Sequence, residues 1–463
     1  MTTAAPSSTD TIVSTNPATG EVVGSVPVTP AGEVGAVIAR AHAAQRAWGE
    51  VPLAERADRL RGLVAAIDAE AEAIAELITR EQGKPLAEAK GEVSAVTGGL
   101  NDELDEIVEA LSPEVRESEG VRSTVYRDPI GVVGAITPWN FPMLMPQWMV
   151  LPALAAGNAV VLKPSDVTPL VAQRYAEALM PLLPEGVLQV VHGGDDQGKA
   201  LVAGDIDLVA FTGSREAGRA IMAAASSGLK RLILELGSKD PLIVLEDADV
   251  EAAADFAASN SYRNCGQVCV STERVYVHRA IAEPFVDRLL AKTAEVAVGD
   301  GMAEGTTMGP MVSAEQRDHV RRQIDDARRR GADVRIDESQ APSVDGAHFL
   351  APTVILNGDH AMDINRVETF GPVASVMVVA DDDEALRLAN DSDLGLGGVV
   401  FGQADHAERV GRRLNVGMVG INKSIGSAAG CPWVGARQSG YGYHQGPDGH
   451  RQFCQTRVVS TSA

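Results

Sequence analysis

Cys269 closes the segment 264–269, Asn-Cys-Gly-Gln-Val-Cys, which stands between an Ala-rich helical pattern at 250–259 and an apolar run at 274–277. A cysteine at such a junction can act, as its thiolate, as a nucleophile toward a carbonyl carbon. The alternative is a buried inert thiol, which is the commoner role of a free cysteine. Cys265 stands four residues earlier, but no second Cys or His pair is near enough in sequence to complete a zinc pattern, so we expect no metal. Position alone leaves both interpretations of Cys269 open.

Two polar side chains follow predicted strands and are suited to assist such a nucleophile. Glu235 comes directly after the apolar run 232–234, where the chain leaves a sheet and ligands of α/β folds bind. Burial there raises the pKa of a carboxyl group, which suits a base that takes a proton from water, but a helix cap explains the residue equally well. Asn140 lies in the segment 137–142, Thr-Pro-Trp-Asn-Phe-Pro, whose prolines would fix its amide as an oxyanion donor. The alternative for Asn140 is a turn residue that satisfies local backbone groups.

Local patterns give only weak support for a dinucleotide site. The Gly-x-Gly-x-x-Gly signature is absent from the sequence. The segment 162–166, Leu-Lys-Pro-Ser-Asp, follows a predicted strand, and the segment 211–218 passes from a strand into a helix. The N-terminus of that helix can meet a phosphate through backbone N–H groups, although Gly-Ser is also common at such turns for conformational reasons.

The elements that must position these residues follow from hydrophobic periodicity. Residues 31–111 have helical patterns, and short apolar runs then alternate with helical segments, which predicts parallel sheets covered on both faces. The boundary between two lobes falls near Gly237. The expected strands are 131–136, 159–162, 187–191, 208–211 and 232–234 in one lobe, and 241–245, 274–277, 373–379 and 397–401 in the other.

Composition and charge narrow the functional class. The chain has 463 residues, 45% of them hydrophobic, and a formal net charge of −23, which is typical of a soluble enzyme and argues against a nucleic-acid partner. Residues 131–162 carry no charge and are long enough to span a bilayer, but four prolines favour a strand, a loop and a core helix instead. Residues 1–8 lack the features of a signal peptide, so we expect a cytoplasmic protein without a membrane partner.

Taken together and in order, these segments resemble the NAD(P)-dependent aldehyde dehydrogenase superfamily over essentially the whole chain. The resemblance implies that Cys269 is the nucleophile and that Glu235 activates the deacylating water. It implies that Asn140 and the Cys269 backbone N–H stabilise the oxyanion. An aldehyde would then be oxidised to its acid through a thiohemiacetal and a thioester.

The resemblance also places the cofactor. It puts Lys163 at the adenosine ribose, the helix start at 213–214 beside the pyrophosphate, and Glu368 at the nicotinamide ribose. Asp166 stands where the family often has Glu, and a carboxylate there should bond the ribose 2′-hydroxyl and repel a 2′-phosphate, so we expect NAD rather than NADP. The expected cofactor residues are Ile136, Thr137, Trp139, Lys163, Ser165, Asp166, Gly213, Ser214, Leu236, Glu368 and Phe370.

The substrate residues depart from any one subgroup. The segment 16–21, Asn-Pro-Ala-Thr-Gly-Glu, and Arg263 resemble succinate-semialdehyde dehydrogenases, in which two arginines hold the distal carboxylate. Trp148 stands where the second arginine is expected, and Trp433 lies in Pro-Trp-Val-Gly at 432–435, where Pro-Phe-Gly-Gly is usual. We therefore expect a more apolar tunnel and an aliphatic or aromatic aldehyde, with succinate semialdehyde as the alternative.

The resemblance further implies an α/β fold with a Rossmann-like cofactor lobe, a catalytic lobe and a small oligomerisation arm. The expected ranges are 1–118 and 137–236 for the NAD-binding domain, 237–432 for the catalytic domain, and 119–136 with 433–463 for the oligomerisation and bridging segments. The alternating segment 452–459 could pair with a partner subunit, so we expect a homodimer or homotetramer.

Two other functional classes are alternatives to the dehydrogenase. A catalytically idle binding or structural homologue is disfavoured because Cys269, Glu235 and Asn140 are all present. A cysteine hydrolase would need a histidine beside the thiol, and none is near Cys269 in sequence.

Overall fold

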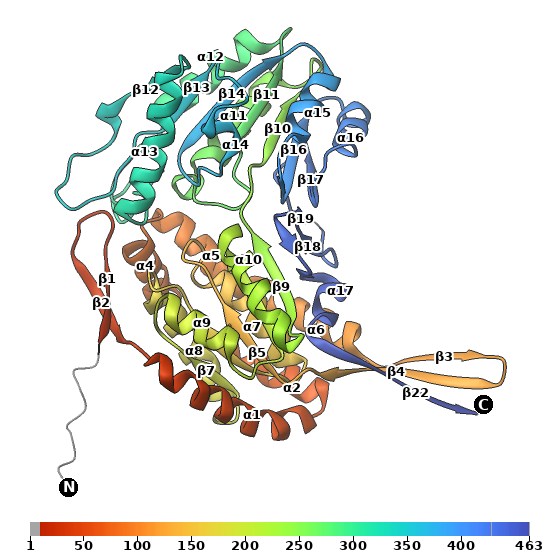
Figure 1. Ribbon diagram of the computed structural model, residues 1–463. Helices are drawn as coiled ribbons and strands as arrows, with labels where there is room; N and C mark the ends of the chain where they lie inside the picture. The colour runs from red at the N-terminus through yellow and green to blue at the C-terminus, as the bar shows by residue number, and fades with distance from the viewer. Residues whose placement is uncertain (1–9, 427, 463) are drawn as a thin grey trace.

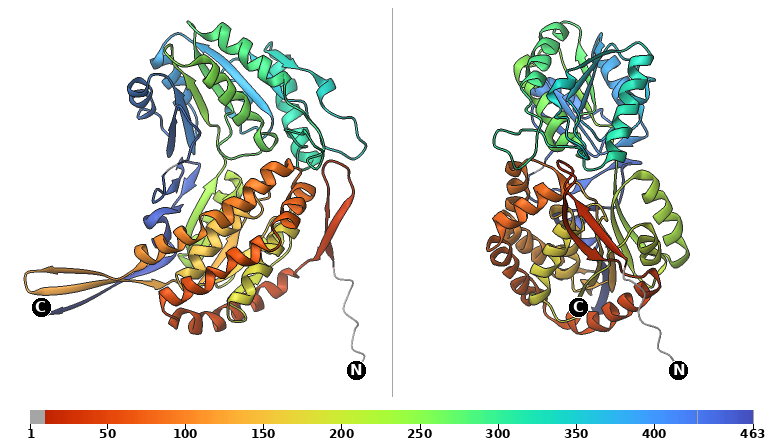
Figure 2. Two further views of the ribbon diagram at one scale, coloured as in Figure 1. Left: turned by 180° about the vertical axis from the view of Figure 1, so that it is seen from behind. Right: turned by 90° about the vertical axis from the view of Figure 1, so that its left-hand side faces the viewer.

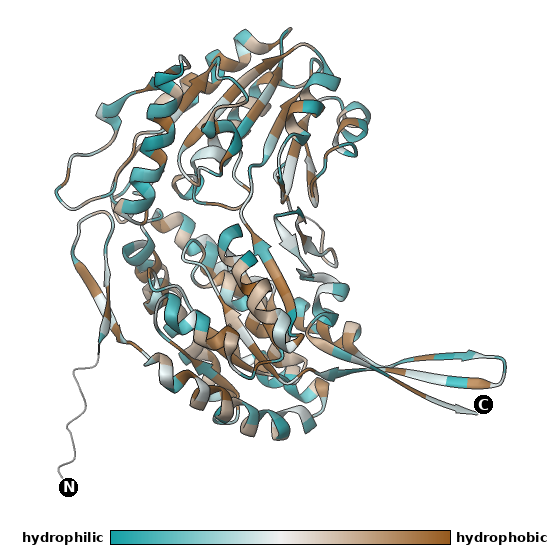
Figure 3. Ribbon diagram, in the orientation of Figure 1, coloured by the Kyte–Doolittle hydropathy of each residue, from teal (hydrophilic) through white to brown (hydrophobic). Residues whose placement is uncertain are grey.

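Two α/β lobes and a projecting antiparallel arm make up the part of the chain that the computed structural model describes, residues 10–426 and 428–462 (Figure 1). Residues 1–8, on which the cytoplasmic expectation rests, lie outside the described residues. The strands of both lobes are hydrophobic along much of their length, whereas polar residues concentrate on the outer surfaces of the helices (Figure 3). Each lobe has a buried apolar core between its sheet and its helices.

The first lobe is built around a sheet with the strand order β20-β9-β8-β5-β6-β7, parallel except for β20 at one edge. Val133 and Ala135 of β5 pack into one core and Val132 and Ile136 into another, because successive side chains of a strand point to opposite faces. All five runs expected as strands in this lobe are strands. They are β5 (Val132–Ile136), β6 (Ala159–Lys163), β7 (Leu188–Val190), β8 (Leu208–Gly213) and β9 (Arg231–Leu236), joined by β20 (Gly440–Tyr441).

Helices cover both faces of this sheet. The helical region expected over 31–111 is confirmed, and the uncharged stretch 131–162 divides, as expected, into β5, α7 and β6. In the described part of the chain, no helix is long and apolar enough to cross a membrane. One face carries α2 (Leu53–Leu60), α3 (Gly62–Asp68), α4 (Ala71–Gln82), α5 (Leu86–Gly98), α6 (Leu100–Leu111), α7 (Leu144–Ala155) and α8 (Pro169–Leu179), and the other carries α1 (Val34–Glu50), α9 (Asp195–Ala203) and α10 (Arg215–Ala225).

The second lobe repeats this plan with the strand order β12-β13-β14-β11-β10-β16-β17, in which only the β12-β13 pair is antiparallel. All four runs expected as strands here are confirmed. The strands are β10 (Pro241–Val244), β11 (Arg274–His278), β12 (Asp333–Ile336), β13 (Thr353–Leu356), β14 (Val373–Val379), β16 (Gly397–Phe401) and β17 (Met418–Ile421). The helices are α11 (Val250–Tyr262), α12 (Ala282–Ala294), α13 (Ala314–Arg329) and α14 (Asp363–Arg366) on one face, and α15 (Asp382–Asn390) and α16 (Ala404–Gly411) on the other.

Smaller elements connect these layers. The hairpin of β1 (Thr11–Thr15) and β2 (Val22–Pro27) lies beside the first lobe (Figure 1). The remaining elements are two-stranded pairs, one further helix and 3-10 turns. They are β15 (Leu394–Gly395) with β19 (Ala436–Arg437), β18 (Trp433–Val434) with β21 (Tyr443–His444), α17 (Gly446–Arg451), and η1 (Ala31–Glu33), η2 (Met180–Leu182), η3 (Ser226–Gly228), η4 (Arg263–Gly266) and η5 (Glu338–Gln340).

The arm is an antiparallel sheet with the order β22-β4-β3, made of β3 (Glu114–Ser118), β4 (Val121–Pro129) and β22 (Cys454–Ser462). It projects from the first lobe, and β22 runs along it beside β4 (Figure 2). The segment 452–459 is largely strand, as expected, and β22 pairs with β4 of the same chain.

The course of the chain differs from the expected domain ranges at two places. The range 119–136 was assigned to the bridging segments, but it ends in β5, which lies in the middle of the first sheet. All residues of β5 are buried there, because strands flank it and helices cover both faces. The range 1–118 was assigned to the cofactor lobe, but β3 pairs with β4 in the arm. The arm therefore begins at Glu114 and its second strand ends at Pro129.

Candidate active site

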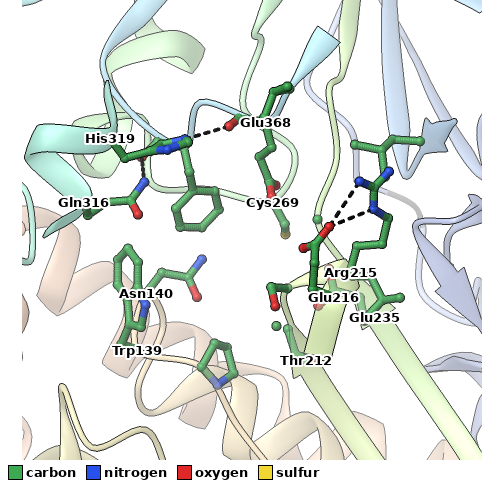
Figure 4. Close-up of a pocket in the computed structure, with 18 of the residues that line it drawn as sticks. Trp139, Asn140, Thr212, Arg215, Glu216, Glu235, Cys269, Gln316, His319 and Glu368 are labelled. Atoms are coloured by element: carbon green, nitrogen blue, oxygen red, sulfur yellow. Dashed lines mark hydrogen bonds and ion pairs between the residues drawn. The ribbon is translucent and has the colours of Figure 1, made fainter. Parts of the chain in front are cut away.

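A cavity of about 430 Å³ lies where the carboxyl ends of β8 and β9 and the loop after β5 meet the second lobe. Cys269, Glu235 and Asn140 all line it (Figure 4). Glu235 belongs to β9, Asn140 to the loop between β5 and α7, and Cys269 to the loop between η4 and β11. Three segments that are far apart in sequence therefore bring a thiol, a carboxylate and an amide to one cavity.

The loop that carries Cys269 turns through consecutive left-handed residues. Asn264, Cys265 and Gly266 have φ values of 50°, 57° and 72°. A Cβ atom on Gly266 would lie 2.0 Å from the carbonyl oxygen of Gly371, so only glycine allows this close approach. Cys265 is buried and its thiol donates to Met311 Sδ at 3.4 Å, which turns it away from the cavity. The turn thus presents one of the two cysteines to the cavity and the other to the core.

Glu235 and Cys269 each have an environment that favours the protonated form. Burial raises the pKa of the Glu235 carboxyl, and the Cys269 thiol, the Thr212 hydroxyl and the Trp433 indole N–H offset part of this effect. Only 4% of Glu235 is exposed, and among the described residues neither of its carboxyl oxygens has a partner in full hydrogen-bond geometry. Burial, and then the Glu235 charge, raise the pKa of Cys269 well above its ordinary value. Both shifts oppose the charged forms, so the thiol becomes a nucleophile only by losing its proton, and the group beside it that can take that proton is the Glu235 carboxylate.

Asn140 is held at both its side chain and its backbone. Its Nδ2 donates to the Gln267 carbonyl oxygen at 3.1 Å, and Gln267 stands two residues before Cys269. Its own carbonyl oxygen accepts hydrogen bonds from Lys84 Nζ at 2.8 Å and from Asn264 Nδ2 at 3.2 Å. One N–H of the Asn140 amide is thus engaged by the Cys269 loop, and the other is available to a ligand.

Comparison with known proteins decides which family combines these features. The sequence model described as the aldehyde dehydrogenase family matches residues 4–459. The chain belongs to the aldehyde dehydrogenase family. This aldehyde dehydrogenase is 35% identical over 461 residues to a chloroplastic betaine aldehyde dehydrogenase of Beta vulgaris, a match covering 96% of the chain and 92% of the relative. It is 36% identical over 459 residues to peroxisomal aminoaldehyde dehydrogenase 1 of Malus domestica, covering 96% and 91%.

Solved structures agree with this assignment. A betaine aldehyde dehydrogenase from Staphylococcus aureus, solved in complex with NAD+, superposes with a TM-score of 0.93 at 32% identity, covering 98% of this chain and 94% of that one. An NADP-dependent enzyme from E. coli superposes with a TM-score of 0.93 at 34% identity, covering 98% and 95%. The expected family and fold class are therefore confirmed, and aldehyde oxidation with NAD(P) is the activity of the family.

Most of the expected cofactor residues of this aldehyde dehydrogenase lie at the carboxyl ends of the strands of the first sheet. They stand at or just beyond the carboxyl ends of β5, β6, β8 and β9, where parallel sheets bind nucleotides, or on the facing second lobe. Those that line the Cys269 cavity are Trp139, Gly213, Ser214, Leu236, Glu368 and Phe370. Those that lie along the edge outside it are Ile136, Thr137, Lys163, Ser165 and Asp166.

The residues of this edge have the chemistry of a nucleotide site. Ser214 caps α10, and its side chain accepts a hydrogen bond from the Ala217 N–H at 3.2 Å. Residues 213–216 line the cavity, so the N-terminus of α10 faces it and can meet a phosphate. Burial lowers the pKa of Lys163, and the Asp166 carboxylate offsets part of that shift. Asp166 is exposed, and the hydroxyl of Thr137, at the end of β5, is buried without a partner among the described residues.

Glu368 approaches the cavity from the second lobe. Its Oε1 accepts a hydrogen bond from the Ser238 N–H at 2.8 Å, and burial raises its pKa to about 8. Glu273 accepts the N–H groups of Thr369 and Phe370, both at 2.8 Å, and so fixes the next two residues of the segment. Phe370 has a φ of 49° and stands edge-on to Trp139, with ring centres 5.4 Å apart.

The three expected substrate residues do not lie together. Trp148 and Trp433 pack with ring centres 5.4 Å apart, and His444 packs on Trp148 at 5.3 Å. Arg263 is exposed and lies over the Phe141 ring at 5.6 Å, beside a second cavity of about 490 Å³. None of the three is among the residues that line the Cys269 cavity, but Trp433 lies close to Glu235 through its indole N–H.

Sequence reasoning missed the residues that hold the catalytic loops. Lys84 and Glu92 hold the Asn140 segment, and Glu88 accepts the Asn264 N–H at 3.1 and 3.3 Å through its two oxygens. Glu273 holds the Phe370 segment. In the sequence these residues read as ordinary charged residues of helices or loops, because their partners come from distant segments.

Proposed function

We propose that this chain oxidises an aldehyde to the carboxylic acid with NAD+, through a thiohemiacetal and a thioester on Cys269. The observation that carries the proposal is the meeting of Cys269, Glu235 and Asn140 at one cavity, with the Glu235 carboxyl facing the thiol. The same arrangement argues against a catalytically idle homologue. It also argues against a cysteine hydrolase, since the base beside the thiol is a carboxylate.

Each chemical step has a residue of this chain suited to it. Loss of the Cys269 proton to the adjacent carboxylate gives a thiolate, which attacks the aldehyde carbon and forms the C–S bond. Asn140 Nδ2 and the Cys269 N–H stabilise the resulting oxyanion, which collapses with loss of hydride to a thioester. The bound nicotinamide supplies the hydride acceptor. Once Glu235 has released the thiol proton to solvent, its carboxylate takes a proton from water, which attacks the thioester. The C–S bond then breaks, and the acid and the Cys269 thiolate are released.

The residues at the carboxyl ends of the first sheet support NAD rather than NADP as the cofactor. The helix start at Ser214 and the edge residue Lys163 would hold the phosphates and the adenosine ribose. The exposed Asp166 carboxylate would accept a hydrogen bond from a ribose 2′-hydroxyl and repel a 2′-phosphate. The relatives include both an NAD+ complex and an NADP-dependent enzyme, so the choice rests on Asp166.

The substrate we propose is an aldehyde with an apolar aliphatic or aromatic body, because Trp148 and Trp433 offer ring surfaces near Glu235. A second candidate is a cationic aldehyde. The same ring faces can hold a cation, and two relatives are named for betaine aldehyde and aminoaldehydes. Succinate semialdehyde is less well supported, since Trp148 stands where the second arginine is expected and Arg263 lines the second cavity.

We also propose that the arm joins two or more copies of this chain. In the described sheet β22 is an edge strand, and Val458 and Val459 are exposed on it. An exposed edge with apolar side chains is stabilised by pairing or packing with another chain. A homodimer or homotetramer in a cytoplasmic setting remains our prediction.

The test is NADH formation with purified protein over a panel of apolar, aromatic, cationic and carboxylate-bearing aldehydes. We expect turnover to require Cys269, so Cys269→Ala should abolish it, whereas Cys431→Ala, at an exposed cysteine, should retain it. Full activity in Cys269→Ala would overturn the proposal. Absence of turnover with every aldehyde, despite measurable NAD+ binding, would revive the idle homologue.

A further inference from the structure

A buried ion pair lies behind the loop that carries Asn140. Lys84 Nζ contacts Glu92 Oε2 at 2.6 Å, and each side chain is only 1% exposed. Lys84 stands between α4 and α5, just after Gly83, which ends α4 with a φ of 100°. Glu92 lies on α5. Because a buried charge is stable only when it is paired and hydrogen-bonded, the remaining contacts of the pair indicate what it holds.

The Lys84–Glu92 pair forms hydrogen bonds with the segment that follows β5 at two points. Lys84 Nζ donates to the Asn140 carbonyl oxygen at 2.8 Å. Glu92 Oε1 accepts the N–H groups of Met143 at 2.9 Å and Leu144 at 3.1 Å, at the start of α7. Lys84 also lies 4.1 Å from the centre of the Phe141 ring. Residues 140–144 are therefore fixed on both sides by one ion pair.

The same carbonyl group connects this pair to the Cys269 loop. Asn264 Nδ2 donates to the Asn140 carbonyl oxygen at 3.2 Å and to the Gln267 carbonyl oxygen at 3.2 Å. Asn140 Nδ2 donates to that Gln267 oxygen at 3.1 Å. The backbone of Asn140 is thus tied to Lys84, and its side chain is tied to the peptide that leads to Cys269.

We propose that Lys84, held by Glu92, is a positioning residue for the oxyanion donor Asn140. Lys84 does not line the Cys269 cavity, so it acts by fixing the Asn140 carbonyl and with it the direction of the side-chain amide. Without this anchor the amide is no longer preorganised toward the oxyanion, and an oxyanion donor contributes fully only when its geometry is fixed in advance. The inference rests on the proposed function, because it assigns a task within that reaction.

Two variants separate positioning from folding. Lys84→Met removes the donor but leaves Glu92 as an unpaired buried carboxylate, which is strongly destabilising. Lys84→Met/Glu92→Gln removes both charges, and the glutamine oxygen can still accept the N–H groups of Met143 and Leu144. The matched control is Lys90→Met, at an exposed lysine on α5, the helix that carries Glu92.

The readout is the limiting single-turnover rate constant for NADH formation, with NAD+ saturating and enzyme in excess over aldehyde, at enzyme concentrations where the constant no longer rises. This constant reports thiohemiacetal formation and oxidation, and it does not depend on the fraction of active enzyme. We expect the paired variant to lower it about 10- to 100-fold, as for partial loss of an oxyanion donor. Alkylation of Cys269 by iodoacetamide, which forms no oxyanion, should stay within twofold of the wild-type rate, and Lys90→Met should behave as wild type in both assays.

A double-mutant cycle with Asn140→Ala then identifies the route. If Lys84 acts through the Asn140 amide, the paired substitution should change the rate constant of Asn140→Ala by less than twofold. A full multiplicative effect in that background would overturn the inference, and so would a parallel loss of Cys269 alkylation or a paired variant within threefold of wild type. Failure of the proposed function looks different, because the wild-type protein and Lys90→Met would then form no NADH.

Discussion

Replacing Glu235 by glutamine tests the central assignment of the site. The amide has the size of the carboxyl group but cannot take a proton from water, so hydrolysis of the thioester should slow more than its formation. General bases contribute about 10²- to 10⁴-fold, or roughly 3–5 kcal/mol. We therefore expect kcat to fall by at least about 100-fold, with one NADH per active site formed before the slow phase. Because burial disfavours the charged form of Glu235, the neutral glutamine should not lower stability.

The pH profile gives a second measure of the same residue. Burial raises the pKa of Glu235, and the base works only when it is deprotonated. Wild-type kcat should therefore decline on acidification at a pH above that of an ordinary glutamate. Glu235→Gln should lack this acidic limb, since the group that titrates there is gone.

The assay is a stopped-flow measurement of NADH with saturating NAD+ and the best aldehyde of the panel, followed into the steady state. The control is Glu216→Gln, at an exposed glutamate that lines the same cavity, and it should retain wild-type kcat and pH dependence. A Glu235→Gln variant with wild-type kcat, or with an unchanged acidic limb, would refute the role of this residue as the base.

Three further substitutions test other parts of the structure. Asp166→Ser should lower the preference for NAD over NADP at least about tenfold, because it removes a negative charge that would face the 2′-phosphate, and kcat/KM for each cofactor measures this. Burial lowers the pKa of His444 to about 3, so the unfolded chain binds a proton below about pH 6.5 that the folded chain does not. The free energy of unfolding should therefore fall as pH falls. The matched variant is His444→Phe, which keeps the packing on Trp148. Between pH 7 and 5 the wild type should lose about 2 kcal/mol more than this variant, as measured by urea unfolding. Gly266→Ala places a methyl group against the Gly371 carbonyl at a residue with a positive φ. It should therefore lower the free energy of unfolding by about 2 kcal/mol or more and slow the alkylation of Cys269. Wild-type values of both quantities would contradict the steric argument.

Much of the fold was predictable because the two central sheets are parallel and buried. Strands such as β5 and β10 are continuous apolar runs, and the helices between them have clear periodicity. The hairpin β1–β2 and the strands β3 and β4 were not predicted. Their residues are mostly exposed, so they lack the apolar pattern that marks a buried strand. The same difficulty misplaced the boundaries of the arm.

The site divides in a similar way. Cys269, Glu235 and Asn140 were predictable because each stands at the end of a predicted element, and the order of their motifs resembles one family. The Lys84–Glu92 pair was not predictable, because a lysine between helices normally faces solvent and the Asn140 carbonyl that it contacts belongs to a distant segment. Arg263 was expected near the substrate from the resemblance, but it lies over the Phe141 ring and lines the second cavity, contacts that depend on segments distant in sequence.

The pairing of β22 with β4 also bears on how the protein is synthesised. β22 is the last strand in chain order, and its Cys454 lies opposite Pro129 while its Ser462 lies opposite Val121. Every strand of both lobes precedes β22 in the chain, so the strands of both sheets are synthesised while the arm still lacks β22. During that interval one edge of β4 is unpaired and open to other nascent chains. A stop codon placed before residue 454 would make that interval permanent, and we expect such a chain to form aggregates on release.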